Sequence, residues 1–113
     1  MVLGLLWQLC AGGEVNEIRH LWAMPSGEVQ IELYSSAPFE PKGELPVLSI
    51  GGRDFLVSGY GPNGDLHTLY FTLTAEEFRQ LKDDDAVTVR YGRDPSAPRR
   101  EFGRLSKAHL RQK

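Results

Sequence analysis

The sequence has a single cysteine, Cys10, and no apolar run of the length that a membrane-spanning helix needs, about 18 residues or more. One cysteine excludes an internal disulfide, and it cannot supply the thiolates of a structural zinc site. We therefore expect a soluble protein of a reducing compartment such as the cytoplasm. The uncharged segment Met1–Gly13 lacks the basic start of a signal peptide, so we interpret it as part of the folded structure. Its apolar character leaves a secreted origin open.

The usual signatures of catalysis and metal binding are also missing. His20, His67 and His109 stand far apart and form no paired metal-binding motif. Asp83–Asp85 are adjacent, without the alternating ligand spacing of a calcium loop. No serine occupies a nucleophile elbow. The sequence therefore indicates no catalytic residue, no metal and no cofactor.

A literal G-x-G-x-x-G pattern occurs at Gly59, Gly61 and Gly64. In a dinucleotide site a helix follows these glycines, and its N-terminal amides bind the pyrophosphate. Here the following residues, 66–73, have a strand pattern, and Pro62 removes one amide. We interpret the glycines as part of a hairpin turn.

The charge is unevenly distributed along the chain. Residues 1–89 carry a net charge of −8 and residues 90–113 a net charge of +6. The basic tail is either docked on the acidic body, held by Glu76, Glu77 and Asp83–Asp85, or offered to an outside anion. The candidate anion contacts are Arg99, Arg100, Arg104, Lys107 and Arg111.

Alternating apolar residues predict several strands. The clearest are residues 28–34, with Val29, Ile31 and Leu33 inward, and residues 66–73; residues 86–91 share the pattern. Residues 45–50 also read as a strand, which we place at a sheet edge because it contains Pro46. After Gly51 and Gly52, the stretch 53–60 continues as strand.

A short helix is predicted over about residues 75–82. Thr74 as N-cap and Glu77 three positions later form a capping box, and Leu73 and Phe78 have the spacing of a hydrophobic staple.

Two segments are ambiguous. Residues 14–24 fit a strand whose inner face carries Ile18, His20, Trp22 and Met24 better than they fit a helix. In the tail, the spacing of Phe102, Leu105 and His109 predicts a short helix or a docked irregular segment.

These elements predict one α+β domain over residues 1–113. It is mainly antiparallel β, a barrel or sandwich of five to seven strands with one short helix, and residues 93–113 form a basic C-terminal tail docked on it. A chain of this length buries enough surface to fold without disulfides or metals.

For function, the sequence favours a non-enzymatic binding or protein-interaction module that self-associates, most simply as a homodimer. Self-association is expected because Val2–Cys10 is apolar on both faces of an extended chain. The first alternative is a small-molecule-binding barrel or enzyme with a pocket near Tyr60, His67 and Tyr70. The second is nucleic-acid binding through the basic tail, which we rank below docking of the tail.

Overall fold

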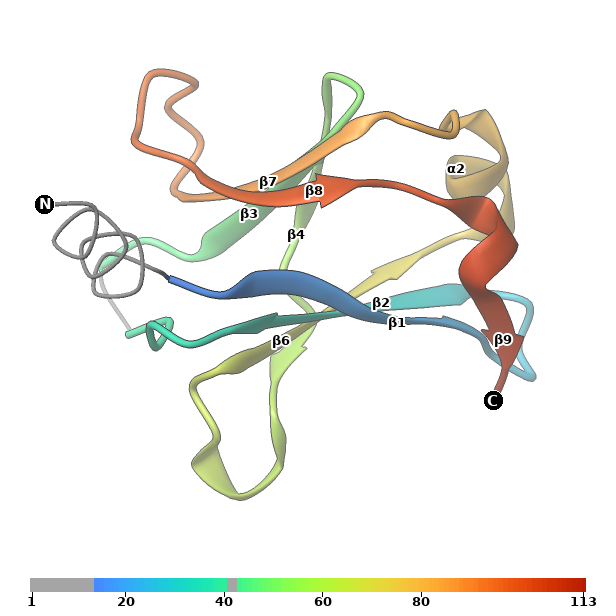
Figure 1. Cartoon of the computed structure of the whole chain (residues 1–113), viewed down its shortest axis with the longest axis horizontal. Helices are drawn as coiled ribbons and strands as arrows, with labels where there is room; N and C mark the ends of the chain where they lie inside the picture. Colours follow the sequence, from blue (N-terminus) through green and yellow to red (C-terminus); the bar gives the residue numbers. More distant parts are fainter. Residues whose placement is uncertain (1–13, 41–42) are drawn as a thin grey trace, which may run out of the picture.

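The computed structural model describes residues 14–40 and 43–113, which form two facing sheets (Figure 1). The strand order is β5-β6-β2-β1-β9 in one sheet and β4-β3-β7-β8 in the other. The strands are β1 (Asn16–Ala23), β2 (Val29–Ser35), β3 (Pro46–Ile50), β4 (Arg53–Leu56), β5 (Gly59–Tyr60), β6 (Thr68–Leu73), β7 (Ala86–Tyr91), β8 (Arg100–Arg104) and β9 (Leu110–Gln112). One α-helix, α2 (Ala75–Gln80), and two 3₁₀ turns, η1 (Pro62–Gly64) and η2 (Lys107–His109), complete the described elements.

This arrangement confirms the predicted β-rich α+β class, and it is sandwich-like. Every pairing is antiparallel except that of β1 with β9. The strands are more numerous than predicted because the stretch 53–60 divides into β4 in one sheet and β5 in the other, and because the tail supplies β8 and β9. Within the described ranges, no helix is long and apolar enough to span a membrane.

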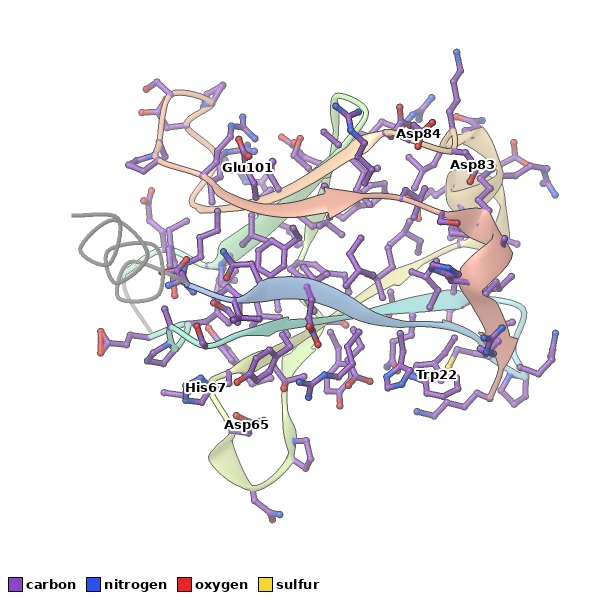
Figure 2. The ribbon with its side chains drawn as sticks, in the orientation of Figure 1. Trp22, Asp65, His67, Asp83, Asp84 and Glu101 are labelled. Carbon is purple, nitrogen blue, oxygen red and sulfur yellow. The ribbon has the colours of Figure 1, made fainter. Side chains whose placement is uncertain are left out.

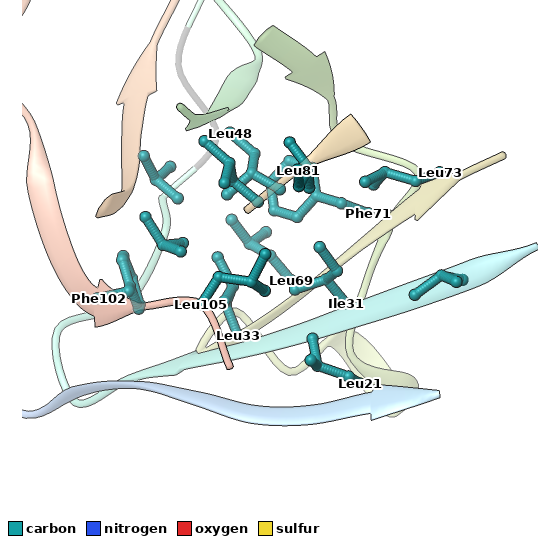
Figure 3. Close-up of a cluster of buried hydrophobic side chains, with 14 of the residues drawn as sticks. Leu21, Ile31, Leu33, Leu48, Leu69, Phe71, Leu73, Leu81, Phe102 and Leu105 are labelled. Carbon is teal, nitrogen blue, oxygen red and sulfur yellow. The ribbon is translucent and has the colours of Figure 1, made fainter. Parts of the chain in front are cut away.

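The inner faces of the two sheets meet in one apolar core (Figure 3). The predicted alternation is confirmed in β2, β6 and β7, whose inward residues are buried. Ile31 of β2 pairs with Phe71 of β6, and Leu33 pairs with Leu69. Each fully buried side chain of this size contributes about 1.5–3 kcal/mol relative to exposure, so these strands supply much of the stability.

The capping box predicted at the start of the helix is confirmed. The Glu77 N–H donates to Oγ1 of Thr74 at 3.0 Å, and the Thr74 N–H donates to Oε1 of Glu77 at 2.8 Å. Leu73 and Phe78 are both buried in the core, as expected for the staple. The helix ends at Gln80, two residues before the predicted limit.

The predicted edge position of β3 is wrong. β3 lies between β4 and β7 in the interior of its sheet. Pro46 is tolerated there because it is the first residue of the strand, a position where proline occurs in sheets. The β3–β4 hairpin turns at Gly51 and Gly52, both with positive φ; a Cβ at Gly51 would also lie 2.6 Å from Oδ2 of Asp85.

The strand predicted over residues 14–24 is present as β1, but its predicted inner face is only partly correct. Ile18 pairs with Leu33 and His20 pairs with Glu32, so the register shifts by one residue at Arg19. This bulge reverses the alternation. Beyond it Leu21 is buried, whereas His20 and Trp22 lie on the outer face.

The tail forms two strands and a 3₁₀ turn, where the spacing predicted a short helix or a docked irregular segment. Phe102 and Leu105 are buried as anchors, but His109 is exposed. The helix-like spacing of the two anchors arises from a second bulge, at which one residue of β7, Val87, faces two of β8, Phe102 and Gly103; the φ of Gly103 is 89°. β8 then pairs with β7 in one sheet, and β9 pairs with β1 in the other.

Candidate functional site

β1 and β8 lie side by side where the two sheets approach each other (Figure 1). Residues of both strands line a groove. β9 pairs with β1 only from Leu21 to Ala23, and no strand among the described residues pairs with β1 on that side from Asn16 to His20. The groove holds a cavity of about 500 Å³. Small-molecule sites usually measure about 300–1,000 Å³, so the cavity has the size of a ligand site.

The floor of this cavity is apolar. It includes Ile18 and Leu21 of β1 and Phe102 of β8. Leu21 and Phe102 are core residues, with exposed fractions of 2% and 3%, and Ile18 packs against the same core. The floor is therefore the edge of the hydrophobic core and is fixed in position by it.

The rim is basic. Arg104, His109 and Arg111 all line the cavity and are exposed. Arg104 donates through Nη1 to the carbonyl of Asp84 at 2.7 Å, which leaves most of its five N–H donors unused. The side chains of His109 and Arg111 make no hydrogen bond or ion pair with any described residue. We call this site, formed by the apolar floor and these three residues, the basic groove.

One acidic residue, Glu17, also lines the groove. Its carboxylate lies 3.5 Å from Nε of Arg19, and the Arg19 guanidinium covers the ring of Tyr34 at 4.0 Å on the outer face of the sheet. Glu17 is thus paired with Arg19, which also lines the groove, as does His20.

The outer face of the five-stranded sheet carries a second group of functional side chains (Figure 2). Figure 2 shows Trp22 and His67 on the side turned away from β7 and β8. The register of β1, β2 and β6 places His20, Tyr34 and Tyr70 on this side as well. We call these five rings the aromatic face.

Charged groups on the aromatic face are paired with the rings or with one another. His20 stacks on Trp22 at 4.6 Å, and Nζ of Lys113 lies 4.9 Å from the Trp22 ring. Oε1 of Glu32 accepts from Nε1 of Trp22 at 3.3 Å and lies 3.3 Å from Nδ1 of His20. At the other end, His67 stacks on Tyr34 at 6.2 Å, and its Nδ1 lies 2.9 Å from the carbonyl oxygen of Ser35.

Tyr70 lies in the middle of the aromatic face, in the row of His20 and Glu32. Partial burial, and then the nearby charges of Glu32 and Asp65, raise the pKa of the Tyr70 hydroxyl above its usual value of 10.0. This residue therefore stays neutral at any physiological pH.

The three residues of the predicted small-molecule pocket do not share one side of the sheet. Tyr70 pairs with Gly59 on the outer face, and His67 contacts Tyr34 there. Tyr60 pairs with Leu69 and packs against the core from the inner side. Tyr60 and Tyr70 lie on opposite faces because of the register between β5 and β6, which the sequence alone does not give.

The five predicted anion contacts fall into separate groups. Arg100 donates to the carbonyls of Ala37 and Pro38, and Arg99 donates to Thr88 and to the carbonyl of Pro95, at one end of β8. Arg104 and Arg111 line the basic groove at the other end. Nζ of Lys107 donates to the carbonyl of Arg79, and its N–H donates to Asp83.

The expected acidic patch meets the tail mainly through the backbone. Asp83 accepts from the Lys107 N–H at 2.7 Å, and the Asp84 and Asp85 backbones bond to Leu105. None of the described ion pairs joins a tail cation to Glu76, Glu77 or Asp83–Asp85.

The outer face of the four-stranded sheet holds a buried cation that the sequence pattern did not indicate. Arg90 is 2% exposed, and its guanidinium donates to both carboxylate oxygens of Asp54, at 3.3 and 2.9 Å. These hydrogen bonds hold the pKa of Asp54 below its usual value of 3.8. The alternation of β7 had placed Arg90 toward solvent, and nothing in the local pattern identifies its partner on β4.

No group of three or more His, Cys, Asp or Glu side chains within residues 14–40 and 43–113 has metal-binding geometry. Cys10 and Val2–Cys10, the basis of the expected self-association, lie outside the described residues.

Comparisons with protein-family models, curated proteins and solved structures found no match for this chain.

Proposed function

We propose that this protein is a non-enzymatic binding module that holds a small-molecule ligand in the basic groove. The observation that carries the proposal is the combination, in one cavity, of an apolar floor fixed by the core with two exposed basic residues, His109 and Arg111, whose side chains have no partner among the described residues. Because both side chains are exposed, water satisfies their donors, and a ligand that binds them displaces water without breaking an internal contact.

The aromatic face supports the same choice by contrast. Arg19 lies over the Tyr34 ring and Lys113 over the Trp22 ring, so a ligand of the aromatic face would first have to displace these side chains. In the basic groove, a ligand can contact the side chains of His109 and Arg111 without displacing another described side chain.

A thermal-shift screen of metabolites, organic acids and metal salts tests this proposal, because a ligand of the native state raises the melting temperature. Ser106 lines the groove without contributing charge, so Ser106→Trp should block the cavity. Ser96→Trp, in the exposed loop after β7, is the matched control. We expect compounds that stabilise the parent and Ser96→Trp but not Ser106→Trp. Ligands that stabilise all three proteins equally would place the binding site elsewhere and refute the proposal.

Self-association is a second candidate function, and one further observation favours it. Leu45 and Leu56 are among the most exposed large apolar side chains, at 57% and 49%, and both line a hollow of about 290 Å³ beside the edge strand β4. Exposed apolar surface next to an open strand edge is typical of contacts between chains. Light scattering at tens of micromolar should report a dimer, and Leu56→Asp should shift it toward monomer. A monomeric parent protein would refute this candidate.

A further inference from the structure

We infer that the ligand of the basic groove is an amphipathic organic anion, with one carboxylate-like headgroup and a short apolar body. This inference rests on the proposed function and specifies its ligand. The headgroup would lie at Arg104, His109 and Arg111, and the body would lie over Ile18, Leu21 and Phe102.

The charge of the rim indicates that the ligand is an anion. Arg104 and Arg111 present guanidinium groups, whose planar donor pairs match the two oxygens of a carboxylate or the oxygens of a phosphate. Glu17 is the one acidic side chain among the lining residues, and it is paired with Arg19. An anion in the groove therefore meets Arg111, whose side chain has no partner among the described residues, and a carboxylate that is already paired with Arg19.

The floor limits how many charges the ligand carries. Ile18, Leu21 and Phe102 offer no polar side-chain atom, so a second charged group placed over them would lose hydration without gaining a hydrogen bond. Leu21 and Phe102 are already buried, so the gain comes from the ligand, whose apolar body loses its own contact with water at about 25 cal/mol per Å². The cavity thus favours one charged end and one apolar end.

The distribution of the tail cations argues against a track for a phosphate backbone. Arg99 and Arg100 bind carbonyl oxygens at the far end of β8, and Lys107 also donates to a carbonyl. Of the five candidate anion contacts, only Arg104 and Arg111 line the cavity of about 500 Å³. A nucleic acid would instead need neutralising contacts along several phosphates.

The inference is tested by isothermal titration calorimetry with octanoate, acetate, octanamide and hexyl phosphate. We expect octanoate to bind at least tenfold more tightly than acetate, which lacks the apolar body, and than octanamide, which lacks the charge. Octanoate and hexyl phosphate share the anionic head and apolar tail, and their relative affinity distinguishes carboxylate from phosphate headgroups. Tenfold corresponds to about 1.4 kcal/mol in binding free energy.

Matched variants locate the headgroup. Arg111→Gln and Arg104→Gln should each weaken octanoate binding at least tenfold, whereas Arg99→Gln, a change of the same kind outside the groove, should leave it unchanged. Equal losses from all three variants would overturn the inference and indicate a diffuse basic surface.

The remaining outcomes separate the two proposals. If octanamide or acetate binds as well as octanoate, the ligand class is wrong while the groove remains the binding site. The same conclusion follows if Ser106→Trp abolishes the binding of uncharged screen compounds only. A single-stranded oligonucleotide that binds tightly and depends on Arg99 as much as on Arg104 would overturn the ligand class. If no compound, octanoate included, distinguishes Ser106→Trp from Ser96→Trp, both proposals fail.

Discussion

The aromatic face and the basic groove both include residues of β1, and they use their charged side chains in opposite ways. On the aromatic face, Lys113 covers Trp22 and Glu32 contacts both Trp22 and His20. In the basic groove, His109 and Arg111 have no such partners within the described structure. The comparison teaches that rings and cations alone do not identify a binding site, because the same residue types also stabilise a fold. The useful distinction is whether their hydrogen-bonding and charge requirements are met internally.

We expect the apolar floor of the groove to contribute more to folding stability than the arginines of β8 do. Phe102→Ala should lower the free energy of unfolding by about 3–5 kcal/mol, because it leaves a cavity in the core. Arg100→Ala and Arg104→Ala together should cost less, since net contributions of hydrogen bonds to carbonyls are about 0.5–3 kcal/mol and Arg104 is exposed. Urea denaturation measures the stability of Phe102→Ala and of the double variant. A double variant as unstable as Phe102→Ala would mean that the charges, and not the apolar anchor, hold the tail.

A second prediction compares a paired arginine with an unpaired one. Arg90→Ala should cost about 2–4 kcal/mol, because it removes a buried stem and charge-assisted hydrogen bonds to Asp54. Arg111→Ala should change stability by less than about 0.5 kcal/mol, as surface substitutions without partners do. Thermal and urea unfolding of the two variants measure the two losses of stability. A marked loss in Arg111→Ala would show that the rim has a structural role after all.

The third prediction makes the same comparison with glutamates. Glu32→Ala removes an acceptor shared by Trp22 and His20, so we expect a loss of about 1 kcal/mol. Glu101→Ala is the control, since this exposed residue of β8 has no side-chain partner among the described residues and should be neutral within about 0.5 kcal/mol. If both variants have the parent's free energy of unfolding in urea titrations, the contacts of Glu32 contribute nothing to stability and the side chains of the aromatic face can bind a ligand.

The smallest expected effect is a shift in titration. Tyr70 should ionise above pH 10.0 in the folded protein, and Glu32→Gln should lower its pKa by removing a nearby negative charge. Because the folded-state pKa is raised, the neutral hydroxyl favours the folded state at all pH values below the unfolded pKa, and this contribution is lost as the pH rises through the folded one. Absorbance of tyrosinate during an alkaline titration, compared with Tyr70→Phe, reports the shift. Ionisation of Tyr70 at or below its ordinary pKa would contradict the described burial.

Sequence reasoning succeeded where the determinants are local. The capping box of Thr74 and Glu77 and the alternation in β2 and β6 depend on residues within a few positions of one another, and the structure has both. The turn after Gly61 was also correct, since Asn63 and Gly64 adopt the positive φ angles that the hairpin interpretation required.

It failed where a partner strand decides the outcome. The bulges at Arg19 and Gly103 reverse the alternation of β1 and β8, and a bulge is defined only by the strand opposite. The burial of Arg90 depends on Asp54, 36 positions earlier in the chain. For the same reason the sequence indicated Arg104 and Arg111 as anion contacts but could not separate them from Arg99, or add His109.

The pairing of β9 with β1 has a consequence for the rate of folding. Leu21 lies opposite Leu110, 89 positions later, and this short parallel ladder completes the edge of the five-stranded sheet. Contacts between such distant positions form only after a large loss of chain entropy, and proteins rich in them fold in milliseconds to seconds. The hairpins β1–β2 and β3–β4 join neighbouring segments and are therefore expected to form early. Since η2 leads directly into β9, the rim of the basic groove should be assembled among the last parts of the molecule.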